Sequence, residues 1–135
     1  MRRPVTVLVL ALALAALSVT ACSTLNFVKR RLPPPTQTAQ GVVFRFAAPS
    51  ASVVQLAGSW PENNWLAGQG QTGSFLVGEM KSDTASGIWT RTEKLPPGRY
   101  QYKFVVDRVN WREDPNNPNR TDDGYGGFNS LIDVQ

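Results

Sequence analysis

The sequence contains no histidine and a single cysteine, and both shortages exclude classes of function. Histidine is the commonest general base and belongs to the serine and cysteine triads, so those mechanisms and histidine-ligated metals are excluded. A glycosidase needs two carboxylates facing each other across a cleft, whereas Glu113 and Asp114, like Asp122 and Asp123, are sequence neighbours. One cysteine cannot form a disulfide within the chain. We therefore expect a protein that is not an enzyme and that holds no metal or cofactor.

Excess positive charge is also missing from most of the chain. The formal net charge is +4, but residues 41–135 hold nine Lys and Arg against ten Asp and Glu, a net charge of −1. A nucleic-acid-binding protein concentrates positive charge on its folded surface. The charge distribution therefore argues against a nucleic-acid partner.

The long apolar run of this sequence is confined to its N-terminus. Residues 5–19 are uncharged and follow Arg2 and Arg3. Fifteen residues are fewer than a helix needs to span a bilayer and are typical of the apolar region of a secretory signal. The run ends in Val19-Thr20-Ala21-Cys22, which resembles the bacterial lipobox. We therefore expect a lipoprotein signal peptide over residues 1–21.

By this resemblance Cys22 becomes the mature N-terminus and carries a diacylglyceryl group, often with an amide-linked acyl chain such as palmitate. An ordinary signal peptide with an incidental cysteine explains less, because Cys22 stands where a lipobox requires it. Ser23 follows, and in Gram-negative bacteria a residue other than aspartate there usually permits transfer to the outer membrane. Residues 32–40 are polar and proline-rich, which predicts a flexible tether over residues 22–40. The expected location is the bacterial cell envelope, lipid-anchored, and in a Gram-negative bacterium the outer rather than the inner membrane.

Short runs of Val, Phe, Tyr and Trp separated by Gly, Pro and Asn favour one all-β domain over residues 41–135. About seven short strands joined by turns predict an immunoglobulin-like β-sandwich. The expected strands are residues 41–46, 52–58, 75–80, 88–95, 99–107 and 128–134, with a short segment at Trp111 after a tight reversal.

The strand at residues 99–107 has the clearest alternation. Tyr100, Tyr102, Phe104 and Val106 fall on one face, which we expect to be the core face. Lys103 falls on the other face and is expected to point outward.

Several segments of the domain, in order, resemble the carbohydrate-binding modules of family 48, known from the glycogen-binding domain of the AMP-activated protein kinase β subunit. The same early-set immunoglobulin-like domain precedes the catalytic barrel of glycogen branching enzymes and isoamylases. The segments that carry the likeness are residues 43–46, 56–60 with 63–65, 95–107, 111–115 and 127–130.

In glycogen-binding members of that family, the sugar lies on two tryptophans and is helped by a lysine and an asparagine. The resemblance places these residues at Trp65, Trp111, Lys103 and Asn129. Tyr125 stands where the family has a leucine that threads the glucan helix. Gly127, shortly before Asn129, stands where a threonine often contacts sugar in that family.

The residue chemistry agrees with this implication. An exposed indole offers a flat surface to the apolar face of a sugar ring, and Lys and Asn offer hydrogen bonds to its hydroxyls. Trp60 and Trp89, by contrast, are expected in the core. The stretch Asp122-Asp123-Gly124 could suggest a calcium loop, but it lacks the alternating oxygen ligands of an EF-hand, and a turn is favoured.

The sequence thus predicts a membrane-anchored, non-catalytic α-glucan-binding module for glycogen, starch or maltooligosaccharide. Its expected partners are an α-glucan and, through acylated Cys22, the lipid bilayer. Two alternatives stay open. The immunoglobulin-like domain could instead mediate contact with another envelope protein, or it could bring a separate glucan-active enzyme to its substrate.

Overall fold

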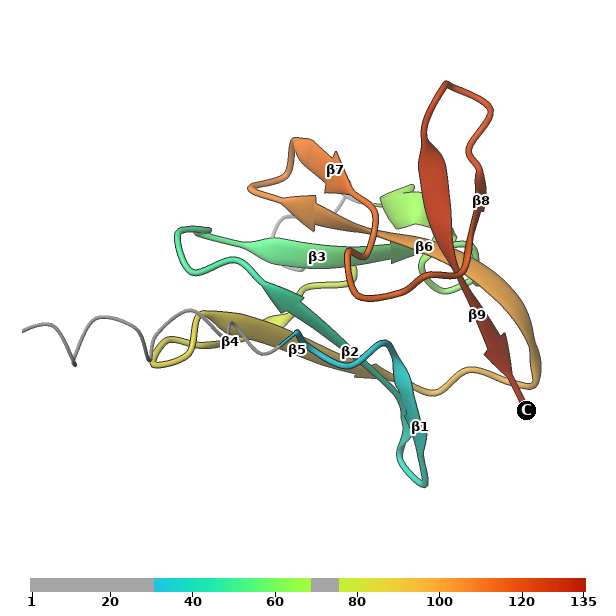
Figure 1. Ribbon diagram of the computed structural model, residues 1–135, viewed down its shortest axis with the longest axis horizontal. Helices are drawn as coiled ribbons and strands as arrows, with labels where there is room; N and C mark the ends of the chain where they lie inside the picture. Colours follow the sequence, from blue (N-terminus) through green and yellow to red (C-terminus); the bar gives the residue numbers. More distant parts are fainter. Residues whose placement is uncertain (1–30, 69–75) are drawn as a thin grey trace, which may run out of the picture. The chain divides into compact units, whose positions relative to one another are not determined.

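Two antiparallel β-sheets face each other in the folded unit Leu32–Gln135 of the computed structural model (Figure 1). The structure describes residues 31–68 and 76–135, so the predicted signal peptide and Cys22 lie outside the described residues. In the described part of the chain, no helix is long and apolar enough to cross a membrane. The predicted all-β, two-sheet architecture is confirmed.

The first sheet has the strand order β1-β2-β5-β4, and the second has β3-β6-β9-β8 with β7 paired to β6. The strands of the first sheet are β1 (Thr36–Thr38), β2 (Gly41–Ala47), β5 (Ile88–Glu93) and β4 (Lys81–Asp83). Those of the second are β3 (Val54–Gly58), β6 (Gly98–Val106), β9 (Phe128–Val134), β8 (Arg120–Asp122) and β7 (Asn110–Arg112).

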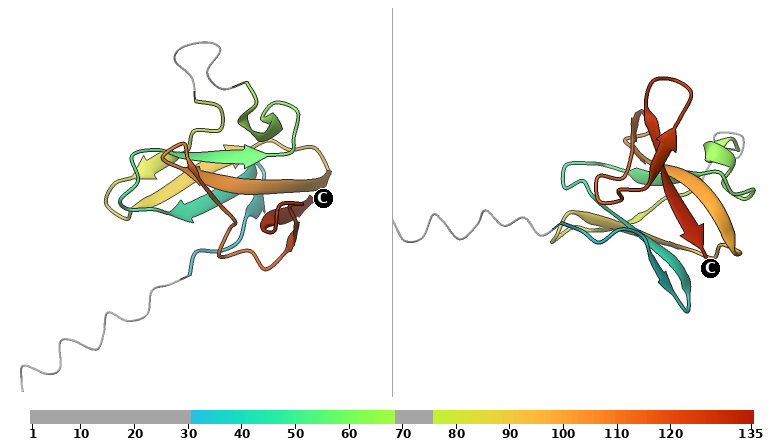
Figure 2. Two further views of the ribbon diagram at one scale, coloured as in Figure 1. Left: turned by 90° about the horizontal axis from the view of Figure 1, so that it is seen from above. Right: turned by 45° about the vertical axis from the view of Figure 1, so that its right-hand side comes forward.

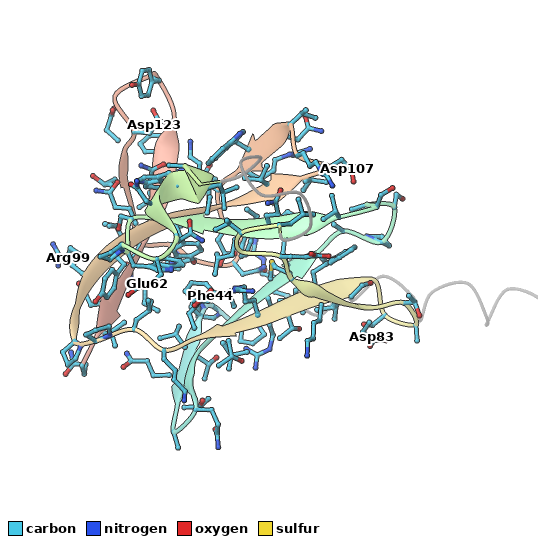
Figure 3. The ribbon with its side chains drawn as sticks, turned by 180° about the vertical axis from the view of Figure 1, so that it is seen from behind. Phe44, Glu62, Asp83, Arg99, Asp107 and Asp123 are labelled. Carbon is cyan, nitrogen blue, oxygen red and sulfur yellow. The ribbon has the colours of Figure 1, made fainter. Side chains whose placement is uncertain are left out.

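Aromatic side chains from both sheets form the core. Phe44 of β2 lies between the sheets (Figure 3) and meets Tyr102 of β6 edge-on, with 5.0 Å between ring centroids. Phe46 and Phe104 make a second contact between β2 and β6, at 4.6 Å. The other buried members of this core are Val42, Val54, Leu56, Trp60, Met80, Trp89 and Ile132. The core positions predicted for Trp60 and Trp89 are confirmed.

The predicted alternation along β6 is also confirmed. Tyr102 and Phe104 have no exposed surface, and Tyr100 and Val106 pack against the same core. Val105 lies on the opposite face and yet is only 1% exposed. The outer face of the second sheet is therefore covered at this point.

A buried hydrogen-bond network ties the segment after β7 to strands β6 and β9. The Tyr102 hydroxyl donates to Asp114 Oδ2 at 2.8 Å and accepts from Asn117 Nδ2, which also donates to the Leu131 carbonyl. The Asp114 amide donates to Ser130 Oγ at 2.7 Å. Burial raises the pKa of the Asp114 carboxyl. The network holds the chain that leaves β7 against the end of the core.

Two expectations from the sequence need correction. Thr36–Thr38, inside the predicted tether, forms strand β1, and the folded unit begins at Leu32 rather than residue 41. Gln37 Nε2 also donates to the Asp133 carbonyl, so this segment contacts the last strand. In the predicted strand at 75–80, the described residues 76–80 form turns and one isolated bridge, between Glu79 and Gln55. The strand follows instead at Lys81–Asp83, where the chain pairs with β5.

The buried network predicts the effect of removing one hydroxyl. Tyr102→Phe leaves Asp114 without one of its donors in a buried site, which should lower the free energy of unfolding by about 1–3 kcal/mol. Tyr100→Phe is the matched control on the same strand, because its hydroxyl donates to the Pro96 carbonyl at an exposed position. Urea unfolding of both variants measures the difference, and equal costs would contradict the assigned role of the network.

Candidate functional site

The register of the second sheet places several predicted site residues on its outer face. Residues directly opposite each other in an antiparallel pair project to the same face. Ala57 lies opposite Lys103, and Val105 lies opposite Trp111. All four therefore share the face of β6 that points away from Tyr102. We call this outer face of β3, β6, β7 and the start of β9 the platform.

Asn129 joins the platform through the pairing of β6 with β9. Gln101 lies opposite Leu131, so these two residues share a face. Residues two positions apart on a strand also share a face, which adds Lys103 on β6 and Asn129 on β9. Asn129 is half-buried, and its Nδ2 donates to Gln101 Oε1 at 2.8 Å.

Trp65 reaches the platform from the loop that follows β3. It is half-buried and packs against a small cluster of Ala57, Leu66 and Val105. Val77 packs against the same cluster, and these contacts bury Val105 on the outer face. Trp111 lies opposite Val105 and is 46% exposed. The two tryptophans therefore lie on the same face of the sheet, one supplied by the loop after β3 and the other by β7.

The backbone at Trp65 is held in an unusual conformation. Trp65 has φ 55° and lies within η2 (Asn64–Leu66), a short turn whose three residues all have positive φ. This region is unfavourable for residues with a bulky side chain. Asn63, which precedes the turn and is 4% exposed, connects the turn to strand β3. Its Oδ1 accepts from the Gly58 amide and its Nδ2 donates to the Leu56 carbonyl, both at 2.7 Å.

Trp111 is placed by the tight reversal between β6 and β7. Asp107 and Arg108 have positive φ, of 50° and 65°, and turn the chain back onto β6. The Asp107 carboxylate accepts hydrogen bonds from the amides of Ser52 and Val53, at 2.7 and 3.2 Å. The turn is therefore fixed to the start of β3, and the reversal predicted before Trp111 is confirmed.

Lys103 lies on the outer face, as predicted, but its ammonium is not free in solvent. Lys103 Nζ donates to Asp123 Oδ2 at 2.7 Å, and the two side chains are 16% and 11% exposed. The other oxygen of Asp123 accepts from the amides of Tyr125 and Gly127. The bond from Lys103 and these two amides lower the pKa of Asp123 to about 2. The sequence indicated only a turn at Asp123 and gave no sign of this pair.

Tyr125 stands at the tip of the loop between β8 and β9 and is 96% exposed. The hairpin projects on the side of the second sheet that faces away from the first sheet (Figure 2). Its loop is folded by two carboxylates, because Asp122 Oδ1 accepts from the Gly124 amide while Asp123 accepts from those of Tyr125 and Gly127. These contacts are those of a turn. In residues 31–68 and 76–135, no cluster of three or more potential metal ligands is present.

A hollow of about 580 Å³ adjoins the platform beside Lys103 and Trp111. One side of the hollow is formed by β7 and the segment that follows it, and the other side by the β8–β9 hairpin. Phe128, which the sequence analysis did not single out, lines it and is 40% exposed, with the Arg120 guanidinium 4.2 Å from its ring centroid. The remaining lining residues are Phe46, Arg112, Glu113, Pro115, Gly126 and Gly127.

The domain that bears the platform is similar to known proteins. Residues 41–135 match the family described as the glycogen recognition site of AMP-activated protein kinase. The chain belongs to this family. Its domain is thus a carbohydrate-binding module of a non-catalytic kind, and the resemblance to this glycogen-binding family stated from the sequence is confirmed. None of the curated proteins matches the chain.

Two solved structures of a PulA mutant from Klebsiella pneumoniae are similar to parts of this glycogen-recognition module. The ligand-free form is 25% identical with a TM-score of 0.43, over 64% of this chain and 8% of PulA. The maltotriose complex is 24% identical with a TM-score of 0.42, over 56% of this chain and 7% of PulA. The chain therefore spans only a small part of the length of these proteins.

The Asn63 contacts predict how the Trp65 turn responds to mutation. Asn63→Ala removes two buried hydrogen bonds and leaves the Gly58 amide and Leu56 carbonyl without them. We expect a loss of about 1–3 kcal/mol in the free energy of unfolding and a more solvent-exposed Trp65. Glu62→Ala, at an exposed neighbouring position, is the control. Urea unfolding and acrylamide quenching of tryptophan fluorescence measure the two effects, and unchanged quenching would show that Asn63 does not hold the turn.

Proposed function

We propose that this chain is a membrane-anchored, non-catalytic α-glucan-binding lipoprotein that holds glycogen, starch or maltooligosaccharide at the bacterial cell envelope. The observation that carries this proposal is the placement of Trp65 and Trp111 on one outer face of the second sheet. Lys103 and Asn129 on the same face add polar groups for sugar hydroxyls. Membership of a glycogen-recognition family supports α-glucans as the ligand class.

The energetics of such a surface favour weak binding to single chains. A sugar ring that covers about 100 Å² of indole contributes about 2.5 kcal/mol at about 25 cal/mol/Å². Two stacks and two hydrogen bonds of about 1 kcal/mol each give about 7 kcal/mol. Association entropy of at least about 4 kcal/mol opposes this, which leaves a net gain of about 3 kcal/mol or less and a dissociation constant in the millimolar range or weaker. Many copies on one membrane would bind a branched polymer more tightly through multivalency.

The two tryptophans supply the direct test. We expect glycogen in a native gel to retard the full chain, purified in mild detergent. Trp65→Ala and Trp111→Ala should each weaken binding at least about tenfold, because each removes one stacking surface. Thr92→Ala, at an exposed position of β5 in the other sheet, is the control and should bind like the wild type.

A wild-type chain that migrates equally with and without glycogen would overturn the α-glucan proposal. The surface would then be assigned to an envelope protein, as in the alternative stated above. If the wild type is retarded, a pull-down from solubilised membranes tests the other alternative, in which the module delivers a separate glucan-active enzyme to its substrate.

The membrane anchor is supported by the sequence Val19-Thr20-Ala21-Cys22 and by the use of the chain's single cysteine at that position. Several acyl chains on one residue hold a protein in a bilayer far more firmly than one chain does. The anchor would concentrate the modules at a surface.

Lipid attachment is tested by metabolic labelling with radioactive palmitate in a bacterial host. We expect the wild-type chain to incorporate label and Cys22→Ser to incorporate none, because the thiol is the attachment group. Ser23→Ala serves as the control and should stay labelled. An unlabelled wild type, or a labelled Cys22→Ser chain, would contradict the anchor.

A further inference from the structure

The Asp123 carboxylate connects the β8–β9 loop to the platform. Its Oδ1 accepts from the amides of Tyr125 and Gly127, at 2.8 and 3.0 Å, and its Oδ2 accepts from Lys103 Nζ. The Asp123 amide donates to the Gly127 carbonyl at 3.1 Å, which closes the loop. Both carboxylate oxygens are therefore engaged, and Figure 3 shows Asp123 in the hairpin that bears this loop.

The pair changes what Lys103 can bind. A lysine side chain has four rotatable carbon–carbon bonds, and a free ammonium attracts any anion within reach. The bond to Asp123 fixes the ammonium at one place on the platform and cancels its charge. Two of the three ammonium N–H groups remain as donors, because one is directed at Oδ2. Such a group suits an uncharged hydroxyl and not a sulfate, phosphate or uronate.

Because Gly127 has no side chain, the Asp123 carboxylate can lie where a Cβ would otherwise be. A Cβ added at Gly127 would lie 2.8 Å from Asp123 Oδ2, the oxygen that holds Lys103. Gly127 does not have positive φ, unlike Gly124 and Gly126 in the same loop. An alanine is therefore compatible with the backbone there and would displace only the carboxylate.

We propose that Asp123 is a positioning and specificity-determining residue of the platform, which fixes Lys103 for uncharged glucans and prevents it from binding anionic polysaccharides. This inference rests on the proposed function and names the class of sugar that the site accepts.

The test compares Asp123→Asn with Asp122→Asn in the full chain. Both substitutions remove one negative charge from the β8–β9 hairpin, but Asp122 contacts the Gly124 amide and not Lys103. We expect Asp123→Asn to weaken maltoheptaose binding about fivefold and Asp122→Asn to change it less than twofold. In gels with dextran sulfate, Asp123→Asn should be retarded more than Asp122→Asn, and added salt should abolish the difference.

A double-mutant cycle separates positioning from a structural role. In a Lys103→Met chain, Asp123→Asn should cause no further loss of maltoheptaose affinity, because the lysine that it positions is gone. An equal loss in both backgrounds, or equal retardation of the two asparagine variants by dextran sulfate, would overturn the proposal. If the wild type does not bind maltoheptaose, the proposed function fails, while the dextran sulfate comparison still decides the role of Asp123.

Gly127→Ala keeps the proposal testable if Asp123→Asn does not fold. Its Cβ should displace the carboxylate and reproduce both the weaker maltoheptaose binding and the stronger dextran sulfate retardation. Gly68→Ala, where an added Cβ meets no atom of the described residues within 4 Å, is the matched control. A Gly127→Ala chain that behaves like the wild type on both polymers would also overturn the proposal.

Discussion

The alternation of side chains along β6 sends Tyr102 and Phe104 into the core and Lys103 and Val105 to the opposite face of the same strand. Because β6 pairs with β3, β7 and β9, its register also sets where the residues of those strands lie. A slip of one residue would exchange the two faces, exposing the core aromatics and burying Lys103. The stability of the sandwich and the geometry of the platform therefore depend on one pairing register.

The platform combines flat apolar surface with a neutralised charge. The indole of Trp111 is partly open to solvent, and Trp65 is held on the same face by a turn that is unfavourable for its own backbone. Strained backbone of this kind persists only where the surrounding structure enforces it, and it concentrates at functional sites. Asn63 provides that enforcement at the Trp65 turn, and Asp123 fixes the ammonium of Lys103 on the same face. We interpret both as residues that fix side chains of the platform in place for an uncharged ligand that binds weakly.

The sequence predicted those features that depend on short-range patterns. Alternating apolar residues located β2, β6 and β9, and the core positions of Trp60 and Trp89 followed from their surroundings in the chain. The pairing of Thr36–Thr38 with β2 could not be predicted, because exposed polar residues next to prolines carry no strand pattern. The bond between Lys103 and Asp123 joins residues twenty positions apart, and only the fold brings them together. Asn63 was visible as part of a motif, but its two buried contacts were not.

The four tryptophans of this chain allow the central claim to be tested within one sample. In a ¹H–¹⁵N NMR spectrum of the full chain in detergent micelles, each indole N–H group gives its own signal. On titration with maltoheptaose, the account predicts that the signals of Trp65 and Trp111 move together along one binding curve, while those of the buried Trp60 and Trp89 stay in place. Unmoved signals of Trp65 and Trp111 at millimolar sugar would contradict the assignment of this face as the carbohydrate-binding surface.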